Sequence, residues 1–429
     1  MRKILCFLLF CIVSLPVMGA ALINDTETER LLYEMVEPLA AAADIPSDRL
    51  KIHIIDDNDF NAFVRGGEDV YVYTGLLKQI KSPSALQAVI AHEMGHMLGG
   101  HTAQMADRMA AEIKRTMLIQ ALGVGLMVAG GNPSLGAGVM AGASGVATQS
   151  MMAFTRDEER IADNMGVDLM VRAGQDVNGF ITVLEQMNDM MGVMESKINP
   201  NRINHPLTTE RLNNVSARIA KHDIHTQNND EYNARYELVR AKLVGYLDTP
   251  QRVLDLYPYS DKSDAGLYAR AIANMRSGNL DGARMGAQTL VYRHPKNPYF
   301  YELLGDIEYQ FGHYDDSIDL YNRSVELSDN APQIQTALAL VLSQRGRDKD
   351  ITRAIELCKH SLLQSPLPLT YWVLARAYGD TDVGRSNWAM AEYYYMNGKK
   401  ELAKQYAMRA QKKLKKTDSE YIKSGELIK

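Results

Sequence analysis

Hydrophobic and polar residues are patterned along the chain in a way that predicts a small sheet followed by helices. Residues 51–56 (KIHIID) alternate with a period of two, and residues 70–74 (VYVYT) are rich in β-branched and aromatic side chains. Both are predicted strands, on either side of a turn at residues 65–67. Residues 85–98 keep apolar positions at helical spacing after a cap at residues 82–84, which predicts a long helix.

Helical spacing returns later in the chain. A helical segment is predicted over residues 157–196, followed by a turn-rich linker over residues 199–206 and a helix capped by Thr208 or Thr209.

An uncharged segment precedes that helical segment, since no charged residue occurs between Arg115 and Arg156. Its apolar stretches are broken by glycines and are shorter than the roughly 20 residues that a bilayer requires. Residues 117–150 are therefore interpreted as a Gly-rich hairpin or lid, with a membrane anchor over residues 117–152 as the alternative.

After about Asp261 the chain repeats with a period of 34 residues. Small residues and glycines recur at this spacing, at Ala271, Gly305 and Ala339 and at Gly278, Gly312 and Gly346. This pattern is typical of tetratricopeptide repeats, in which paired helices cross at small residues and turn at a glycine. Extra residues near 348–350 and a shortened unit at residues 379–385 interrupt it. We expect a helical solenoid over residues 263–429 whose partners are polypeptides.

The N-terminus differs in composition from the rest. Arg2 and Lys3 precede an apolar run and small residues around Ala20, which predicts a secretory signal peptide over residues 1–20. Loss of these two cations changes the formal net charge from −5 to −7, and Cys358 is then the one cysteine left of three. An internal disulfide is thereby excluded. The acidic excess argues against nucleic acid as a partner, and 46% hydrophobic with 23% charged residues excludes wholesale disorder.

The candidate chemistry lies at residues 92–96, which read HEMGH. Residues i and i+4 share one face of a helix, so His92 and His96 can bind one metal ion while Glu93 reaches a water molecule beside it. A catalytic zinc needs a third protein ligand and one open position. His101 is a poor candidate, because in a continuing helix it lies on the face opposite His92.

A better third ligand is expected from residues 155–163, which read TRDEERIAD. Glu159 and Asp163 lie one turn apart on a face with apolar neighbours, and Ala162 leaves room for close packing. Buried carboxylates need a metal or a cation. This favours Glu159 as the ligand and Asp163 as the group that orients a metal-bound histidine. Glu158 points about 100° away.

These motifs resemble the metallopeptidase family of HtpX and the CAAX prenyl proteases. The resemblance rests on HEMGH, on the ExxAD of residues 159–163, on residues 61–63 and 74–76, and on Asn204-His205-Pro206 with Arg211.

The resemblance implies a gluzincin-type domain that binds one Zn²⁺ per chain through His92, His96 and Glu159. It also implies Glu93 as the catalytic base and Asp163 as a further catalytic residue or proton donor. With an export signal and repeats, the chain is similar to periplasmic members that assist outer-membrane β-barrel assembly. That similarity implies misfolded or stalled outer-membrane proteins as substrates, the outer-membrane assembly machinery as a partner of the repeats, and peripheral rather than integral membrane association.

His205 has three possible roles on sequence grounds. Pro206 holds it extended just before a helix, so its ring can project into the cleft. There it can stabilise the oxyanion, or occupy the open position of the zinc as a neutral imidazole and hold the enzyme idle, or have no role. The predicted strand at residues 70–74 can bind an extended peptide by β-augmentation.

The resulting expectation is an α+β, mostly helical protein. Residues 21–262 are predicted to form a zinc metalloprotease domain with a small β-sheet, and residues 263–429 the repeat domain. The predicted function is a periplasmic zinc endopeptidase with a chaperone-like role in outer-membrane protein assembly and quality control. The alternative is a chaperone or scaffold that acts through the repeats, with latent or secondary protease activity.

Overall fold

The computed structural model describes residues 11–14, 21–66, 68–101, 104, 107, 155–194, 205, 209–222, 230–379 and 381–428. The lid predicted at residues 117–150 lies outside these ranges, as does most of the predicted signal peptide. Within the described part of the chain, no helix combines the length and the apolar character needed to cross a membrane.

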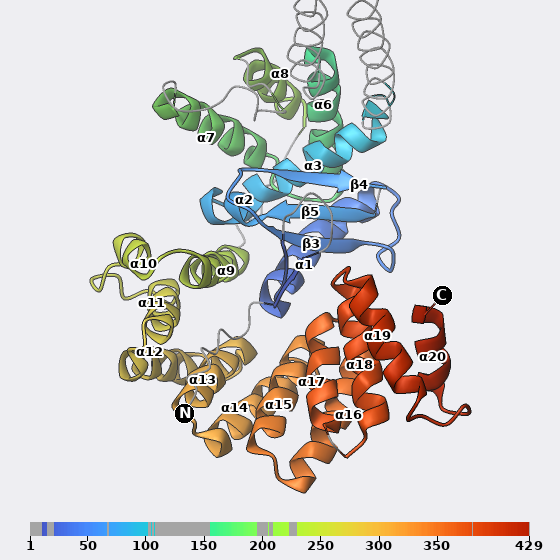
Figure 1. Ribbon diagram of the computed structural model, residues 1–429. Coiled ribbons are helices and arrows are strands. Elements are labelled where there is room, and N and C mark those ends of the chain that lie inside the picture. The colour runs from blue at the N-terminus through green and yellow to red at the C-terminus, as the bar shows by residue number, and fades with distance from the viewer. Residues whose placement is uncertain are drawn as a thin grey trace, which may run out of the picture.

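Five short strands form one mixed sheet in the order β1-β2-β3-β5-β4 (Figure 1). Their bounds are β1 Cys11–Ser14, β2 Ala21–Asn24, β3 Lys51–Asp56, β4 Ala62–Arg65 and β5 Asp69–Tyr73. The two predicted strands are confirmed as β3 and β5, which pair in parallel, whereas the other neighbouring strands pair antiparallel. β1 falls inside the predicted signal peptide, and the remaining four strands form a continuous sheet without it.

The position of β5 in the sheet shows that the expected binding of an extended peptide by this strand is wrong. Since β3 and β4 flank β5 on its two sides, its backbone groups are already paired and it cannot accept an extended peptide. β4 lies at the end of the described sheet and packs against the helix that carries HEMGH. The edge available for strand addition beside that helix is therefore β4.

Helices cover the face of the sheet that carries Ile54 and Val72, both almost completely buried. They form one core with the sheet, and their bounds are α1 Thr26–Ala42, α2 Thr74–Gln79, α3 Pro83–Leu98, α6 Arg156–Arg172, α7 Asn178–Met194, α8 Thr209–Ile219 and α9 Asp230–Leu247. The predicted helix at residues 85–98 is confirmed as α3, whose first turn is capped when Ser82 Oγ accepts from the backbone N–H of Ala85.

The single helical segment predicted over residues 157–196 is wrong, because it is two helices. Gly174 adopts a φ of 67°, and the backbone N–H of Gln175 donates to the carbonyl of Met170. This left-handed glycine ends α6, and the chain reverses before α7 begins.

The C-terminal part is a succession of helical hairpins that curves beneath the sheet (Figure 1). The bounds are α10 Pro250–Leu256, α11 Asp264–Arg276, α12 Leu280–Arg293, α13 Pro298–Phe311, α14 Tyr314–Leu327, α15 Pro332–Arg345, α16 Asp348–Gln364, α17 Pro368–Tyr378, α18 Val383–Met396, α19 Lys400–Gln411 and α20 Ser419–Ile428. Gly278, Gly312 and Gly346 have φ values of 79°, 79° and 76°. The glycines spaced by 34 residues therefore make the turns of successive hairpins, as predicted.

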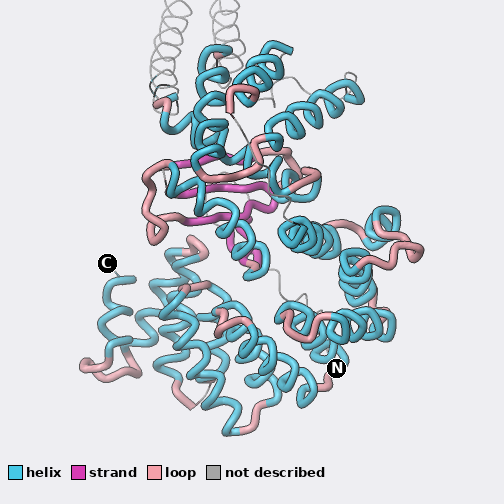
Figure 2. Tube along the Cα trace, turned by 180° about the vertical axis from the view of Figure 1, so that it is seen from behind, coloured by secondary structure: helices cyan, strands magenta, loops and turns pink. Residues whose placement is uncertain are grey.

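The N-terminal end of α1 meets the arc of hairpins, an arrangement that Figure 2 shows from behind. Thr26 Oγ1 donates to Gln333 Oε1 at 2.9 Å, and Gln333 Nε2 donates to Glu29 Oε2 at 2.9 Å. Arg30 donates to the carbonyl of Ser328 at 2.5 Å. The start of the first helix is therefore bonded to the start of α15, about three hundred residues later in the chain.

A buried group of charges, called here the junction cluster, lies beside these contacts. Its members come from α1 with the residue before it, α9, α11, α13 and α14, and they are Asp25, Glu27, Lys242, Tyr246, Tyr268, Glu302, Asp306 and Tyr321. Lys242 Nζ pairs with Asp25 and Glu27 and lies 3.8 Å from Glu302. Three carboxyl groups thus share one ammonium group in a place with little access to water, and Asp306 lies nearby, bonded to Tyr246 and Tyr321.

Burial in this cluster raises the pKa of two of its carboxyl groups. Burial raises the pKa of Glu302 to about 8 against the lowering effect of Lys242, and burial raises the pKa of Asp306 to about 6. A carboxyl group whose pKa is higher in the folded than in the unfolded protein stabilises the fold fully below its unfolded pKa. That contribution is lost as the pH rises from about 4.5 through about 8.

We expect Glu302→Gln to remove part of this pH dependence. The variant should unfold with a free energy close to that of the wild type at pH 5. At pH 9 it should be more stable by about 1 kcal/mol or more, the equivalent of one pKa unit. Thermal unfolding followed by circular dichroism at both pH values measures the difference, with the exposed Glu326→Gln on α14 as the matched control. An equal loss of stability at both pH values would contradict the prediction.

Candidate active site

The site is built where α3 crosses α6. A Cβ atom added to Gly95 would overlap the backbone carbonyl of Ala162, and one added to Gly166 would lie 3.0 Å from the backbone of Ala91. The two helices can approach this closely because these positions carry small side chains, as the sequence predicted for Ala162. The contact brings the face of α3 with His92 against the face of α6 with Glu159.

Four side chains converge on one point at this crossing: His92, His96, Glu159 and His205. Their ligand atoms all lie within 4.8 Å of one another. Nε2 of His92 lies 3.1 Å from Nε2 of His96, and each of these nitrogens lies 3.4 Å from an oxygen of Glu159. Nδ1 of His205 lies 3.2 Å from Nε2 of His92 and 2.9 Å from Oε1 of Glu159.

These separations fit a four-coordinate metal ion. Nitrogen and oxygen ligands bound tetrahedrally at about 2.0–2.1 Å lie roughly 3.3 Å from one another. The observed separations of 2.9–3.4 Å are close to this value. The structure therefore brings together the three residues predicted as ligands and adds His205 at the fourth corner.

The position of Glu159 is set by the start of its helix. Thr155 Oγ1 accepts from the backbone N–H of Glu158, and the Glu158 carboxylate accepts from the backbone N–H of Thr155 at 2.8 Å. In this capping box the Glu158 carboxylate bonds to the start of its own helix, α6. The sequence analysis excluded Glu158 from the site because its side chain points away from Glu159. In the structure Glu158 caps the start of α6.

Asp163 and Arg211 support the ligands from behind. Oδ1 of Asp163 lies 2.8 Å from Nδ1 of His92, on the side of the ring opposite the ligand nitrogen. Arg211, on α8, donates from Nε and Nη2 to the two oxygens of Asp163 at 2.9 and 2.8 Å, and its Nη1 lies 2.8 Å from Glu159. One guanidinium group thus holds both carboxylates of α6, a role that spacing along the chain does not reveal.

His101 is also part of the site, against the expectation from helical geometry. α3 ends at Leu98, and Gly100 adopts a φ of 70°, so His101, although helical again, does not continue the spacing of α3. His101 is 3% exposed, and its Nδ1 lies 3.1 Å from Nδ1 of His96. It therefore supports His96 as Asp163 supports His92.

The electrostatics of the cluster favour an ionised carboxylate beside a neutral imidazole. Burial alone would raise the pKa of Glu159, but hydrogen bonds from His205, His92 and His96 hold it well below its usual range. Burial lowers the pKa of His96 to about 3. Burial would also lower the pKa of His92, yet its contact with Asp163 raises it to about 9, while the pKa of Asp163 itself falls to about 2 despite burial. A neutral imidazole and an ionised carboxylate are the forms that bind a metal ion, so His96 and Glu159 are already in the binding form, whereas His92 must lose a proton when the metal ion binds.

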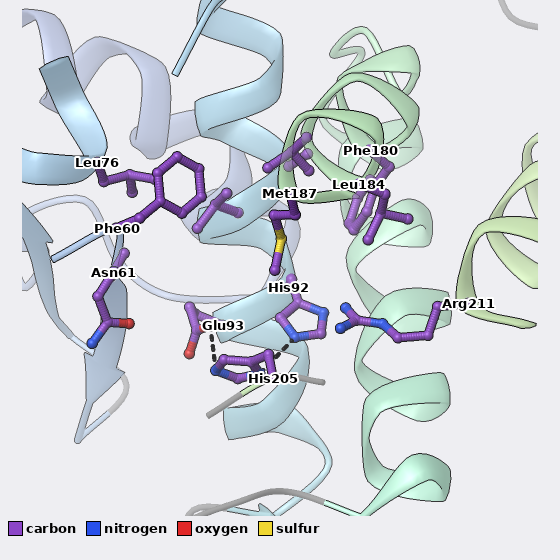
Figure 3. A pocket seen from close by; sticks show the side chains of 14 residues that line it. Phe60, Asn61, Leu76, His92, Glu93, Phe180, Leu184, Met187, His205 and Arg211 are labelled. Carbon is purple, nitrogen blue, oxygen red and sulfur yellow. Dashed lines mark hydrogen bonds and ion pairs between the residues drawn. The ribbon is translucent and has the colours of Figure 1, made fainter. Parts of the chain in front are cut away.

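Glu93 lies beside the ligands without belonging to them. Burial raises the pKa of Glu93 above its ordinary value, although His205 and His92 act in the opposite direction. Figure 3 shows the ring of His205 between Glu93 and His92, and Nε2 of His205 lies 3.3 Å from Oε1 of Glu93. His205 therefore places Nδ1 at the fourth corner of the ligand set and directs Nε2 to Glu93.

A second group of possible ligands on the hairpins is of a different kind. Glu308, His313 and Asp316 lie close together, but His313 and Asp316 are exposed and Arg284 pairs with Glu308. A guanidinium group already neutralises that carboxylate, so we assign no site there.

Comparison with known proteins agrees with this geometry. Residues 26–219 match the model of peptidase family M48. The chain contains an M48 peptidase domain. The matched range begins at α1 and ends at α8, so this M48 domain includes every side chain of the cluster. M48 peptidases are metallopeptidases, and the four clustered side chains within the matched range could hold a divalent metal ion.

Several curated proteins are similar to the chain beyond the M48 domain. The Escherichia coli (strain K12) protein named β-barrel assembly-enhancing protease is 25% identical over 340 residues, which cover 77% of this chain and 68% of that protein. A Vibrio cholerae protein named putative β-barrel assembly-enhancing protease is 25% identical over 66% of this chain and 59% of its own length. The mitochondrial metalloendopeptidase OMA1 of Schizosaccharomyces pombe is 24% identical over 50% of this chain and 60% of its own length.

We expect His101→Leu to weaken metal binding without abolishing it. Loss of a residue that supports a metal ligand typically reduces affinity 10- to 100-fold. Competition with a chromogenic chelator measures the affinity. His294→Ala, an exposed histidine on the hairpins, provides the control and should bind metal like the wild type. Unchanged affinity in His101→Leu would show that the contact with His96 has no supporting role.

Proposed function

We propose that the protein is a zinc-dependent endopeptidase. The observation that carries this proposal is the ligand set itself, in which two imidazole nitrogens, a carboxylate and a third imidazole stand at tetrahedral separations beside Glu93. Mixed nitrogen and oxygen donors in tetrahedral arrangement suit zinc better than magnesium or calcium, which take more oxygen ligands. One zinc ion per chain would be held by His92, His96 and Glu159.

Glu93 is proposed as the general base. Zinc, when bound, polarises the scissile carbonyl and lowers the pKa of a coordinated water to about 7. The Glu93 carboxylate takes one proton from the attacking water as the new carbon–oxygen bond forms. It returns that proton to the amine nitrogen as the carbon–nitrogen bond breaks, so the base is regenerated. A raised pKa suits both steps, because the base must hold the proton between them.

His205 is proposed to hold the enzyme idle. A role in stabilising the oxyanion requires the ring of His205 to leave the fourth corner free for water, which this position does not. A histidine without a role would not contact both Glu159 and Glu93. A ring at that corner competes with the attacking water, and its second nitrogen contacts the base that would activate this water. Asp163, held ionised by His92 and Arg211, is proposed to position His92 and not to donate a proton.

The substrate backbone is proposed to run along β4. This strand packs against α3, and β-augmentation there would lay an extended peptide across the mouth of the site. Recognition through main-chain hydrogen bonds depends on an unfolded segment more than on its sequence. Such a protease suits unfolded polypeptides.

The biological setting is proposed from the relatives and the hairpins together. Two bacterial relatives are named for β-barrel assembly, and a curved helical repeat array presents an extended surface to polypeptides. We propose periplasmic action on misfolded or stalled outer-membrane proteins, with the assembly machinery bound by the repeats. The predicted signal peptide agrees with export.

Glu93→Gln tests the proposed chemistry. The variant should retain one zinc ion per chain and lose cleavage of unfolded casein or unfolded porin by at least about 100-fold, the usual contribution of a general base. Metal analysis and a gel assay measure the two quantities. Persistent proteolysis would sink the assignment, and a zinc-free, inactive wild type would overturn it. Full restoration of assembly by this variant in a deletion strain would favour the chaperone or scaffold function instead.

His205→Ala separates the three roles of that residue. If the ring blocks the fourth corner, basal cleavage should rise on the order of tenfold, as expected for loss of a competing interaction of about 1.4 kcal/mol. A decrease would instead assign the ring to the oxyanion, and an unchanged rate would leave it without a role. His222→Ala, a half-buried histidine outside the ligand set, is the control.

A further inference from the structure

The last hairpin concentrates positive charge that the proposed function does not use. Residues 399–416 contain seven lysines, one arginine and a single acid, Glu401, which gives this segment a net charge of +7. The whole chain has a net charge of −5, so the remainder of the chain carries −12. All eight cationic side chains of the segment are exposed. We call the exposed side chains of residues 399–416 the basic face.

The cations of the basic face are not neutralised by carboxylates. On the earlier hairpins, Arg284 pairs with Glu308 and Arg293 pairs with Asp264. Within the described residues 381–428, by contrast, none of the eight cations of the basic face forms an ion pair with any described carboxylate. An anionic partner can therefore approach these side chains without breaking an internal ion pair.

α19 presents the basic face along its length. The inner side of this helix packs against α18 and α20 through three buried alanines, Ala403, Ala407 and Ala410. On its exposed side Lys400 and Lys404 are four residues apart, and Lys412 follows eight residues later, so the three lie along one line. The helix has 12 residues and is about 18 Å long. Figure 1 shows it at the end of the arc of hairpins, close to the C-terminus.

The lysines at the start of α19 are unfavourable for the helix itself. The N-terminal end of a helix carries a partial positive charge, so acids stabilise it and cations destabilise it. Lys399 occupies the N-cap position without a capping hydrogen bond from its side chain, and Lys400 is the first helical residue. The lysines that follow Gln411 lie at the favourable end. Helix stability therefore explains only one half of the basic face, whereas binding of an anionic partner explains both.

Apolar side chains are exposed among these cations. Leu402 and Met408 on α19 are 38% and 42% exposed, and Tyr395 on α18 and Ile422 on α20 are 52% and 59% exposed. A helix with cations and apolar side chains exposed together is typical of helices that lie at a membrane surface. Clusters of roughly four to eight Lys or Arg on such a helix are typical of binding to anionic lipids.

We propose that the basic face binds the phosphate headgroups of an anionic lipid bilayer and holds the last hairpin against the membrane surface. Lysines predominate in it, and an ammonium group is a point charge, whereas the guanidinium fork of arginine suits one particular carboxylate. This composition favours a continuous anionic surface over a single acidic peptide. The remainder of the chain, at −12, is repelled by the same surface, so the protein binds with α19 toward the lipid.

The test measures how the exported form of the chain partitions onto vesicles, because an uncleaved signal peptide would itself bind lipid. Vesicles of equal parts phosphatidylglycerol and phosphatidylcholine supply the anionic surface, and pure phosphatidylcholine supplies the neutral one. Each cation near an anionic surface contributes about a fivefold factor, so we expect a preference for the anionic vesicles of at least about 100-fold. Salt at about 1 M should remove most of this preference, because it shortens the screening length to about 3 Å.

Substitution of the lysines separates the basic face from the net charge of the chain. Replacement of the four lysines of residues 412–416 by Gln should lower partition onto anionic vesicles at least about 100-fold. The matched control replaces four exposed lysines on other hairpins by Gln and has the same net charge; they are Lys262, Lys296, Lys349 and Lys359. The control should bind like the wild type. An equal loss in both variants would overturn the inference.

A second variant distinguishes loss of binding from loss of folding. Lys399→Asp with Lys400→Glu introduces a preferred N-cap residue and an acid in the first turn of α19, so the protein should unfold at the same or a higher temperature. The same variant changes the charge of the basic face by four units and should lower partition onto anionic vesicles at least about 100-fold. Circular dichroism measures the unfolding, and vesicle flotation measures the partition.

The outcomes are independent of the proposed function, which the inference goes beyond. Equal binding to anionic and neutral vesicles, or unchanged binding in both lysine variants, would overturn the inference. Binding of polyglutamate without binding of anionic vesicles would assign the basic face to an acidic polypeptide and would also overturn it. None of these measurements involves peptide cleavage, so a failure of the endopeptidase function would leave the result at the basic face unaffected.

Discussion

The close contact between Gly95 on α3 and Ala162 on α6 is the constraint on which the rest of the site depends. Neither helix holds a complete ligand set, since α3 supplies two imidazoles and α6 supplies the carboxylate. Only a crossing with almost no side chain between the backbones places these atoms about 3 Å apart. The small size of Gly95 and Ala162, which carry no polar side chain, therefore decides whether the histidines of α3 and the carboxylate of α6 can meet.

Charge compensation links the site to the surrounding helices. Arg211 on α8 neutralises two carboxylates of α6, and Asp163 in turn orients His92 on α3. Buried charge must also be compensated at the junction cluster, where Lys242 faces three carboxyl groups. The two places differ in balance. At the site Asp163 and Glu159 each have a cationic or imidazole partner, whereas at the junction cluster burial raises the pKa of Glu302 and Asp306 and Lys242 does not offset it.

Local periodicity made much of the site predictable. His92, His96, Glu93 and Glu159 followed from helical spacing, as did the exclusion of Glu158, and the 34-residue glycine spacing predicted the hairpin turns. What escaped prediction depends on backbone reversals or on distant segments. His101 required the left-handed Gly100, and the end of α6 required the left-handed Gly174. Arg211 was noticed through the resemblance alone, and its role escaped prediction because it reaches Asp163 from another helix.

The capping box at Thr155 and Glu158 has a consequence for how such a protein can evolve. A helix that satisfies its own first backbone groups does not need the preceding chain to fix where it begins. Glu159 is the next residue after this self-contained turn, so its position does not depend on how the chain arrives at Thr155. The stretch between His101 and Thr155 can therefore gain or lose residues, or change its composition, while the position of Glu159 is inherited unchanged.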